Sequence, residues 1–235
     1  MGTGNLLSRP VRGITDILSS LIDWLFPPQC LICGKIPDAA PFLCESCYRA
    51  CSVFDDCPDS GAHHEDKPAN RVCVMFTFDE YIQKLVHQLK YRDMPYIGTF
   101  LGQRVGKYYQ HHDIANCDAL VPIPLNAVRK RERTYNQSSY IARGIASVWG
   151  IPVEERLLKR CRNTRTQTRL NRDERRENIR DAFVLRNKKQ IPERVCLIDD
   201  VFTTGATTME AARTLKRSGV RMVHILTLAT PRKNQ

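Results

Sequence analysis

Two adjacent aspartates follow a short apolar run, and this arrangement constrains the fold more than any other feature of the sequence. Residues 195–198 are apolar, Asp199 and Asp200 come next, and a threonine-rich stretch follows, in the order VCLIDDVFTTGATT. Four consecutive apolar residues are typical of a buried strand in a parallel sheet. Because ligands of open α/β sheets bind beyond the carboxyl ends of the strands, the two carboxylates are predicted to face a ligand.

The threonine-rich stretch predicts an anion site. Hydroxyl groups and free backbone N–H groups at the start of a helix suit a phosphate, and glycine allows backbone angles that are closed to other residues. Helix capping accounts for one or two of these residues, but not for two acids and four threonines between residues 199 and 208. The segment therefore indicates a sugar phosphate, with its phosphate held by Thr203, Thr204, Gly205, Ala206 and Thr207.

Apolar periodicity predicts alternating strands and helices after residue 70. Strands are expected at 72–78, 118–124, 182–185, 195–198 and 223–229, and helices at 80–92, 97–109, 136–149 and 207–219. Such alternation implies a parallel sheet with flanking helices and right-handed crossovers. The predicted fold class is therefore α/β, preceded by a small N-terminal ribbon. The predicted domains are an amphipathic helix at 1–26, the ribbon at 27–70 and the α/β domain at 71–235.

Four cysteines near the start predict a metal centre. Cys30, Cys33, Cys44 and Cys47 form two C-x2-C pairs separated by ten residues. Each pair directs two thiolates at one point, and two pairs supply the four sulfur ligands of a tetrahedral zinc ion. Because all four positions would be protein ligands, the predicted zinc is structural and a zinc ribbon is expected.

The other cysteines carry a weaker signal. Cys51, Cys57, His63 and His64 could hold a second metal, but their spacing is irregular and the segment around them is also typical of an exposed loop. Burial as small apolar side chains is the prediction for the remaining four, which are Cys73, Cys117, Cys161 and Cys196.

The charge of the chain predicts an anionic partner. The formal net charge is +11, and residues 156–194 hold fourteen Lys or Arg against five Asp or Glu. Segment 14–26 is apolar but is broken by Asp16 and Asp23. It is too short to span a bilayer. It is interpreted as a packing helix, with a helix lying on a membrane surface as the alternative. Without a signal-peptide pattern, a cytoplasmic protein with reduced thiols is predicted.

Two basic segments complete the candidate site. The predicted strand at 118–124 ends through Pro122 and Pro124, which fix the backbone there. Pro122 and the following Arg129 and Arg131 are predicted to lie at a bound pyrophosphate. Arg172 and Arg176 lie in the second segment and are predicted to act in catalysis, since guanidinium forks match phosphate geometry. A solvated surface explains any single arginine, but the whole cluster repels itself unless an anion binds.

The order of these motifs resembles the ComF family. The resemblance rests on the paired cysteines, then HQLKYR, VPIPL, RTYNQ, TQTRLNRDERRENIRDAF and VCLIDDVFTTGATT, over roughly residues 20–230. It implies a type I phosphoribosyltransferase-like fold that binds 5-phosphoribosyl 1-pyrophosphate (PRPP) with magnesium. By the same resemblance, Asp199 and Asp200 would hold the ribose hydroxyls, and the turn at 203–207 would hold the 5-phosphate. The segment CPDSG departs from the family pattern, which weakens the case for a second metal.

Two functions follow from this resemblance. One is a phosphoribosyl-binding protein that serves DNA uptake in natural transformation, with single-stranded DNA and the uptake machinery as partners. There, Tyr135 or Tyr140 would stack on bases. The alternative is an active phosphoribosyltransferase of nucleotide metabolism with no DNA role, although no residue is assignable to recognition of a base. The acid pair favours phosphoribosyl binding over DNA binding alone, because DNA binding alone has no use for two carboxylates beside a phosphate site.

Overall fold

The computed structural model describes residues 27–38, 40–57, 68–126, 133–161, 181–186 and 191–231. The chain divides into two compact units, a cysteine unit (Met1–Arg49) and an α/β unit (Ala50–Gln235). Within the described residues, no helix is both long and apolar enough to cross a membrane. The predicted amphipathic segment at 14–26 lies outside them, and the predicted domain bounds stay a prediction.

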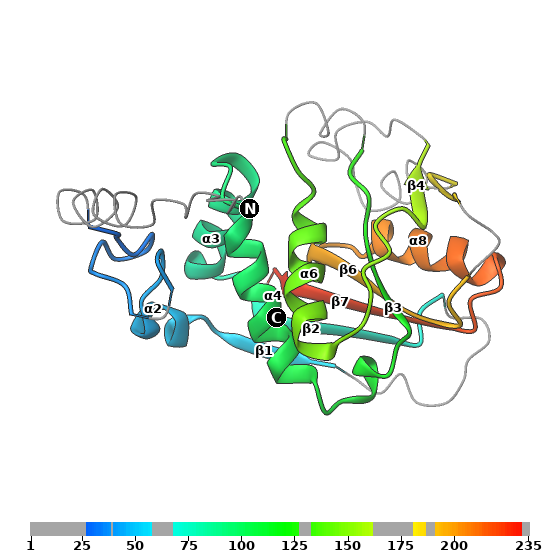
Figure 1. The fold of residues 1–235 in the computed structure, drawn as a ribbon, viewed down its shortest axis with the longest axis horizontal. Helices are drawn as coiled ribbons and strands as arrows, with labels where there is room; N and C mark the ends of the chain where they lie inside the picture. The colour runs from blue at the N-terminus through cyan, green and yellow to red at the C-terminus, as the bar shows by residue number, and fades with distance from the viewer. Residues whose placement is uncertain are drawn as a thin grey trace, which may run out of the picture. The chain divides into compact units, whose positions relative to one another are not determined.

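The α/β unit is built on one five-stranded sheet in the order β1-β2-β7-β6-β3 (Figure 1). The strands are β1 (Val53–Asp56), β2 (Arg71–Thr77), β3 (Ala119–Pro122), β6 (Arg194–Val201) and β7 (Met222–Thr230). Four of them run parallel, and only β1, at one edge, is antiparallel to its neighbour. The central strands are buried on both faces, as the apolar runs of the sequence require. The predicted mixed α/β fold with a mostly parallel sheet is confirmed.

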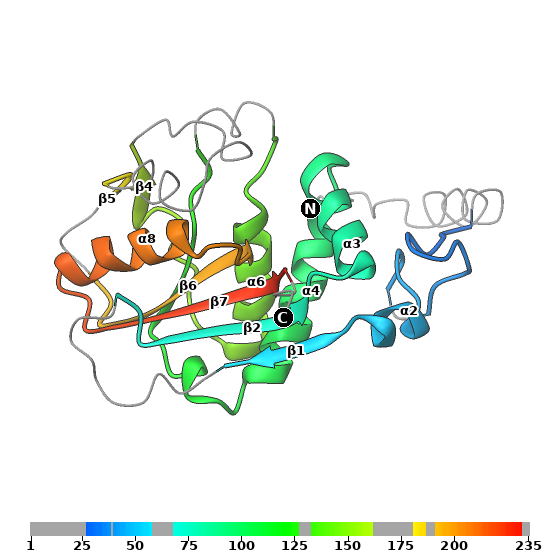
Figure 2. The ribbon, with the colours of Figure 1, turned by 180° about the vertical axis from the view of Figure 1, so that it is seen from behind.

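Helices cover both faces of this sheet, as the opposite views in Figures 1 and 2 show. They are α3 (Glu80–Tyr91), α4 (Pro95–Tyr109), α6 (Gln137–Trp149) and α8 (Ala206–Arg217). Helix α8 packs on one face of the sheet. Val195 and Leu197, whose side chains point to the same face of β6, share a core with Leu215 of α8. The opposite face meets α4 and α6. All four helices lie within two residues of their predicted bounds.

Helices α4 and α6 cross with their backbones in contact at two glycines. A Cβ atom on Gly102 would lie 2.2 Å from the carbonyl oxygen of Ile141, and one on Gly144 would lie 2.2 Å from that of Thr99. Only glycine permits this approach, because no real Cβ comes so close to another backbone. The crossing holds α6 against the sheet and so fixes the position of its N-terminus.

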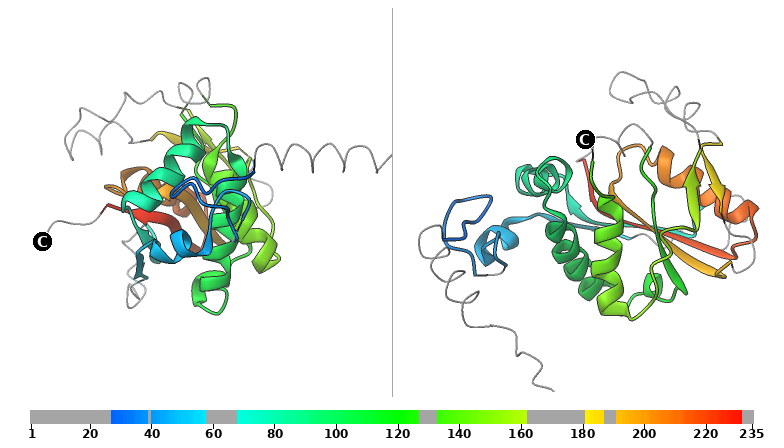
Figure 3. Two further views of the ribbon diagram at one scale, coloured as in Figure 1. Left: turned by 90° about the vertical axis from the view of Figure 1, so that its left-hand side faces the viewer. Right: turned by 45° about the horizontal axis from the view of Figure 1, so that its top comes forward.

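A separate two-stranded sheet departs from the predicted arrangement. The residues predicted as a strand at 182–185 form β5 (Phe183–Leu185), which pairs antiparallel with β4 (Leu158–Arg160) and does not join the parallel sheet. The pair lies beside α8 (Figure 3). It is closed by a hydrogen bond of 2.9 Å from the backbone N–H of Cys161 to the carbonyl of Ala182. Cys161 and Ala182, one before and one after this stretch of the sequence, are thereby held together.

Candidate functional site

The acid pair lies within the last three residues of strand β6 rather than after its end. The strand continues to Val201, because Asp199 pairs with Thr227 and Val201 with Ala229 of the longer strand β7. Successive side chains of a strand point to opposite faces, so the two carboxylates have different neighbours. The predicted apolar strand is thus extended by three residues at the carboxyl edge of the sheet.

Asp200 forms an ion pair with a lysine from helix α3. Nζ of Lys90 lies 2.6 Å from Oδ2 of Asp200, with 17% and 15% of the two side chains exposed. The sequence analysis cited HQLKYR only as a family motif and gave Lys90 no role. A signal was present, because Lys90 follows the buried Ile82 and Val86 at helical spacing and therefore lies on the apolar face of α3.

Asp199 is held by two donors and is hard to ionise. The Oγ of Ser138 donates to its Oδ1 over 3.1 Å, and the backbone N–H of Asp200 donates to the same atom over 3.0 Å. Burial, followed by the neighbouring charge of Asp200, raises the pKa of Asp199 to about 7. The hydrogen bonds and Lys90 act in the opposite direction but do not outweigh these two effects. Near neutral pH the site therefore favours a proton or a cation.

The segment before α6 joins the α3 end to the acid pair. The hydroxyl of Tyr135 donates to the carbonyl of Leu89, and the guanidinium of Arg133 lies 5.4 Å from the ring centroid of Tyr91. Nδ2 of Asn136 donates to the carbonyl of Ile123 over 3.0 Å, just after Pro122 ends β3. The RTYNQ and HQLKYR motifs, far apart in sequence, thus meet beside β6.

The predicted phosphate turn forms a small pocket with Asp199. Gly205 has a φ of 69°, in the left-handed region, and a Cβ there would lie 2.4 Å from Cζ of Phe202. The hydroxyl of Thr208 donates to the carbonyl of Gly205 over 3.1 Å. The pocket is lined by Asp199, Val201, Phe202, Thr203, Thr204, Gly205, Ala206, Thr207 and Thr208. All five residues predicted to bind phosphate therefore share one pocket with the first acid, at the N-terminus of α8.

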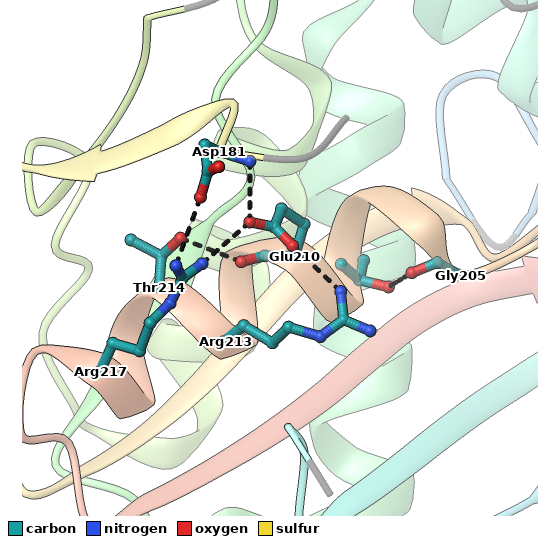
Figure 4. Close-up of polar contacts among 7 residues, drawn as sticks. Asp181, Gly205, Glu210, Arg213, Thr214 and Arg217 are labelled. Atoms are coloured by element: carbon teal, nitrogen blue, oxygen red, sulfur yellow. Dashed lines mark hydrogen bonds and ion pairs between the residues drawn. The ribbon is translucent and has the colours of Figure 1, made fainter. Parts of the chain in front are cut away.

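A buried carboxylate anchors α8 to the residue that follows the basic segment (Figure 4). Glu210 accepts from the backbone N–H of Asp181 over 3.0 Å, and its side chain is 5% exposed. Arg213 and Arg217 donate to the same carboxylate over 3.0 and 3.1 Å. The helix that builds the phosphate turn is thus connected to the end of segment 162–180.

Several predicted site residues lie outside the described residues. Arg129 and Arg131, predicted to meet pyrophosphate, fall in segment 127–132, and Arg172 and Arg176 fall in segment 162–180. Their roles stay predictions. Tyr135 and Tyr140 pack edge to face with ring centroids 5.1 Å apart, and both are partly buried. Their stacking on bases stays a prediction.

The four predicted zinc ligands lie together in the cysteine unit. The Sγ atoms of Cys30, Cys33, Cys44 and Cys47 are within 4.8 Å of one another, and those of Cys33 and Cys44 are 3.7 Å apart. Sulfurs about 2.3 Å from a tetrahedral zinc ion lie about 3.8 Å apart, so the cluster fits this metal. The Oγ of Ser46, 3.1 Å away, is the main cause that lowers the pKa of Cys44 to about 6, which favours the thiolate that zinc requires.

Cys57 and Cys73 form a disulfide, which corrects the prediction of reduced thiols for this pair. Strand β1 pairs antiparallel with β2, with Asp56 opposite Val74, so the next residues along, Cys57 and Cys73, face each other with Cα atoms 4.1 Å apart. Among the described residues, Cys51 belongs to no cluster of potential metal ligands, and burial raises its pKa to about 12. His63 and His64 lie outside the described residues.

Sequence comparisons find relatives along most of the chain, although no family model matches it. Competence protein F of Haemophilus influenzae is 28% identical over 220 residues, which cover 86% of this chain and 96% of that protein. DNA utilization protein YhgH of Salmonella typhimurium is 28% identical and covers 83% of this chain and 87% of its own. Competence protein ComFC of Streptococcus pneumoniae is 26% identical over 66% of each chain. The resemblance to the ComF family, predicted from the motifs, is confirmed by these homologues.

Structure comparisons match two solved structures, each with a TM-score below 0.5. One is the glutamine PRPP amidotransferase of B. subtilis complexed with ADP and GMP, at 20% identity and a TM-score of 0.38, covering 60% of this chain and 30% of that chain. The other is described as the allosteric regulatory enzyme of purine biosynthesis, at 19% identity and a TM-score of 0.38, covering 60% of this chain and 29% of that one.

Proposed function

We propose that this chain binds PRPP, or a phosphoribosyl group, and serves DNA uptake. The observation that carries the first half is the pocket in which Asp199 faces a threonine-rich turn at the N-terminus of α8. A carboxylate accepts hydrogen bonds from sugar hydroxyls, and the turn offers donors to a phosphate. The second half is supported by the names of the relatives, which are a competence protein F and a DNA utilization protein.

Each part of the candidate site has a distinct role in this proposal. Asp199 and Asp200 would orient the ribose through its hydroxyl groups, and the turn at 203–207 would hold the 5-phosphate by its backbone N–H groups and hydroxyls. Pro122 would border the site at the end of β3. Magnesium, bound with PRPP, would neutralise the charge of the pyrophosphate. Carboxylate oxygens are suitable ligands for magnesium.

Structural zinc is the second component of the proposal. Cys30, Cys33, Cys44 and Cys47 would hold the ion as thiolates and leave no position for water. The zinc would therefore stabilise the cysteine unit rather than take part in a reaction.

Calorimetry with PRPP and magnesium tests the ligand. The parent protein should bind, and Asp199→Asn plus Asp200→Asn should lose binding while its circular dichroism stays that of the parent. Glu193→Gln changes an exposed carboxylate immediately before strand β6. It is the matched control and should bind PRPP as the parent does. A parent protein that does not bind PRPP contradicts the proposal.

Titration with single-stranded DNA across salt concentrations tests the role in DNA uptake. If the arginines of segment 156–180 contact phosphates, the logarithm of the affinity should fall with that of the salt concentration by about 0.7 per contact. Arg172→Ala plus Arg176→Ala should reduce this slope. Lys84→Ala plus Lys107→Ala removes the same charge from two exposed helix positions and should not. DNA binding that is undetectable at low salt would remove this half of the proposal.

An active phosphoribosyltransferase of nucleotide metabolism is the alternative, and the same pocket favours it. In that case a nitrogen nucleophile would form a bond to the anomeric carbon while pyrophosphate leaves with the bonding electrons. Pyrophosphate release from PRPP in the presence of nucleobases or ammonia distinguishes the two. The alternative is favoured if the parent releases pyrophosphate and does not bind DNA, and if Asp199→Asn plus Asp200→Asn abolishes that release.

A further inference from the structure

The ion pair of Lys90 with Asp200 lies next to Asp199 in strand β6, and Asp199 lines the pocket of the predicted phosphate turn. The distance of 2.6 Å from Nζ to Oδ2 is that of a short charge-assisted hydrogen bond, and both side chains are mostly buried. Salt screens buried charges less than exposed ones, so the pair persists at physiological ionic strength. A cation built into the chain thus compensates one of the two carboxylates.

The backbone at Lys90 is held in place by its neighbours. Helix α3 is capped by Asp79, Leu89 is fully buried, and the hydroxyl of Tyr135 holds the carbonyl of Leu89. A lysine carries its ammonium on a flexible four-carbon stem, and the ammonium binds a carboxylate as a point charge rather than as a rigid fork. A ligand that offers more to Asp200 can therefore displace the ammonium without disturbing α3.

We propose that Lys90 is a specificity-determining residue of this site, an internal cation that a magnesium-bearing sugar phosphate must displace from Asp200. The inference rests on the proposed function for the identity of that ligand. Two adjacent carboxylates attract hard divalent cations. With Lys90 in place, a bare cation must break the ion pair and gains only the acid pair in return. A sugar phosphate also gains the donors of the turn at 203–207.

Binding of Mn²⁺ in the absence of PRPP tests the proposal, with free Mn²⁺ followed by electron paramagnetic resonance on zinc-loaded, full-length protein. The parent should bind Mn²⁺ weakly, and Lys90→Met should bind it about tenfold more tightly, since one neighbouring charge shifts such equilibria by that amount or more. Lys90→Arg keeps the charge and should behave as the parent. Lys84→Met removes an exposed lysine from the same helix and should also change nothing.

The site of the added affinity is identified by a double variant. Lys90→Met combined with Asp200→Asn should lose the gain, because the carboxylate released by the first change is removed by the second. Lys90→Gln, which is neutral but still donates to Asp200, is a second variant in case Lys90→Met folds poorly, and it should also bind Mn²⁺ more tightly. Circular dichroism and thermal melting establish the folded state of each.

Three results would overturn the proposal. They are tight Mn²⁺ binding by the parent without PRPP, folded Lys90→Met or Lys90→Gln proteins with the affinity of the parent, and a gain that survives Asp200→Asn. None of these measurements contains PRPP. Absence of PRPP binding in calorimetry would contradict the proposed function and leave the role of Lys90 to be decided by the Mn²⁺ data alone.

Discussion

The cysteine unit and the α/β unit each gather reactive side chains at one point, but by different means. Among the described residues of the cysteine unit, the buried apolar side chains besides three of the cysteines are Phe42 and Leu43. The α/β unit has an extensive core on both faces of its sheet, and its acid pair lies at the edge of that core. In the first unit the ligand atoms are themselves the core, whereas in the second a complete core supports the site.

This difference reverses the relation between site and stability. Thiolates that bind zinc contribute folding energy, because a small unit without a large core depends on its metal. Partly buried carboxylates that repel each other oppose folding, and the surrounding core must offset their cost. The two sites should therefore respond in opposite directions when their charged groups are removed.

The largest effect is expected for Cys44→Ser. A structural zinc site contributes about 10 kcal/mol or more, so loss of one thiolate should release the zinc and unfold the cysteine unit. The α/β unit should stay folded, because its core is separate. Zinc release, measured with a chromogenic chelator, and limited proteolysis report the two outcomes.

Cys161→Ser is the matched control for this change, since Cys161 is an exposed cysteine outside the cluster. It should retain its zinc and its resistance to proteolysis. Freshly purified parent protein without zinc would remove the contrast between the two units.

An intermediate effect is expected for Gly205→Ala, which alters the site but not the core. The added Cβ would be strained at a φ of 69° and would lie 2.4 Å from the ring of Phe202. Displacement of the turn should weaken PRPP binding about tenfold or more, whereas the free energy of unfolding should fall by only about 1 kcal/mol. Calorimetry and urea unfolding measure the two quantities.

Gly150→Ala provides a close control, because Gly150 has the same φ of 69° with no atom within 4 Å of an added Cβ. It lies at the C-terminus of α6, away from the turn, and should cost similar stability without loss of PRPP affinity. Equal losses of affinity in both variants would show that strain, and not the turn, controls binding.

The sequence predicts what is local in both units. The spacing of the cysteines, the apolar strands and the order of acids and threonines are properties of short segments, and the structure agrees with them. Strands β1 and β4 escape sequence analysis because they are four and three residues long and carry no clear alternation. Strand β5 is predicted, but its antiparallel pairing with β4 is not.

Contacts between distant segments escape it for another reason. Ser138 lies 61 residues from Asp199 along the chain, and Cys57 lies 16 residues from Cys73. These pairs form because strands and helices bring them together, and no local pattern encodes the partner. Lys90 is intermediate, since its place on the apolar face of α3 marks it as unusual, but only the fold identifies Asp200 as its partner.

The smallest effect is expected for Asp199→Asn, and it tests whether the acid pair opposes folding. The pKa of Asp199 is raised from 3.8 to about 7, mainly by burial, so the folded state holds a proton that the unfolded state releases. Stability from this group is therefore complete below pH 3.8 and is lost as the pH rises through 7.

Asparagine stays neutral and can still accept from Ser138. Because the carboxyl group is only partly buried, the variant should gain only about 0.5–1 kcal/mol at pH 8 and less at pH 5. Urea unfolding at both pH values measures this difference, and Glu193→Gln, at an exposed position, should show no such dependence. If the variant gains the same free energy of unfolding at pH 5 and pH 8, or loses free energy at pH 8, the charge of Asp199 does not oppose folding. The contrast with the cysteine site, whose thiolates are expected to support folding, would then fail.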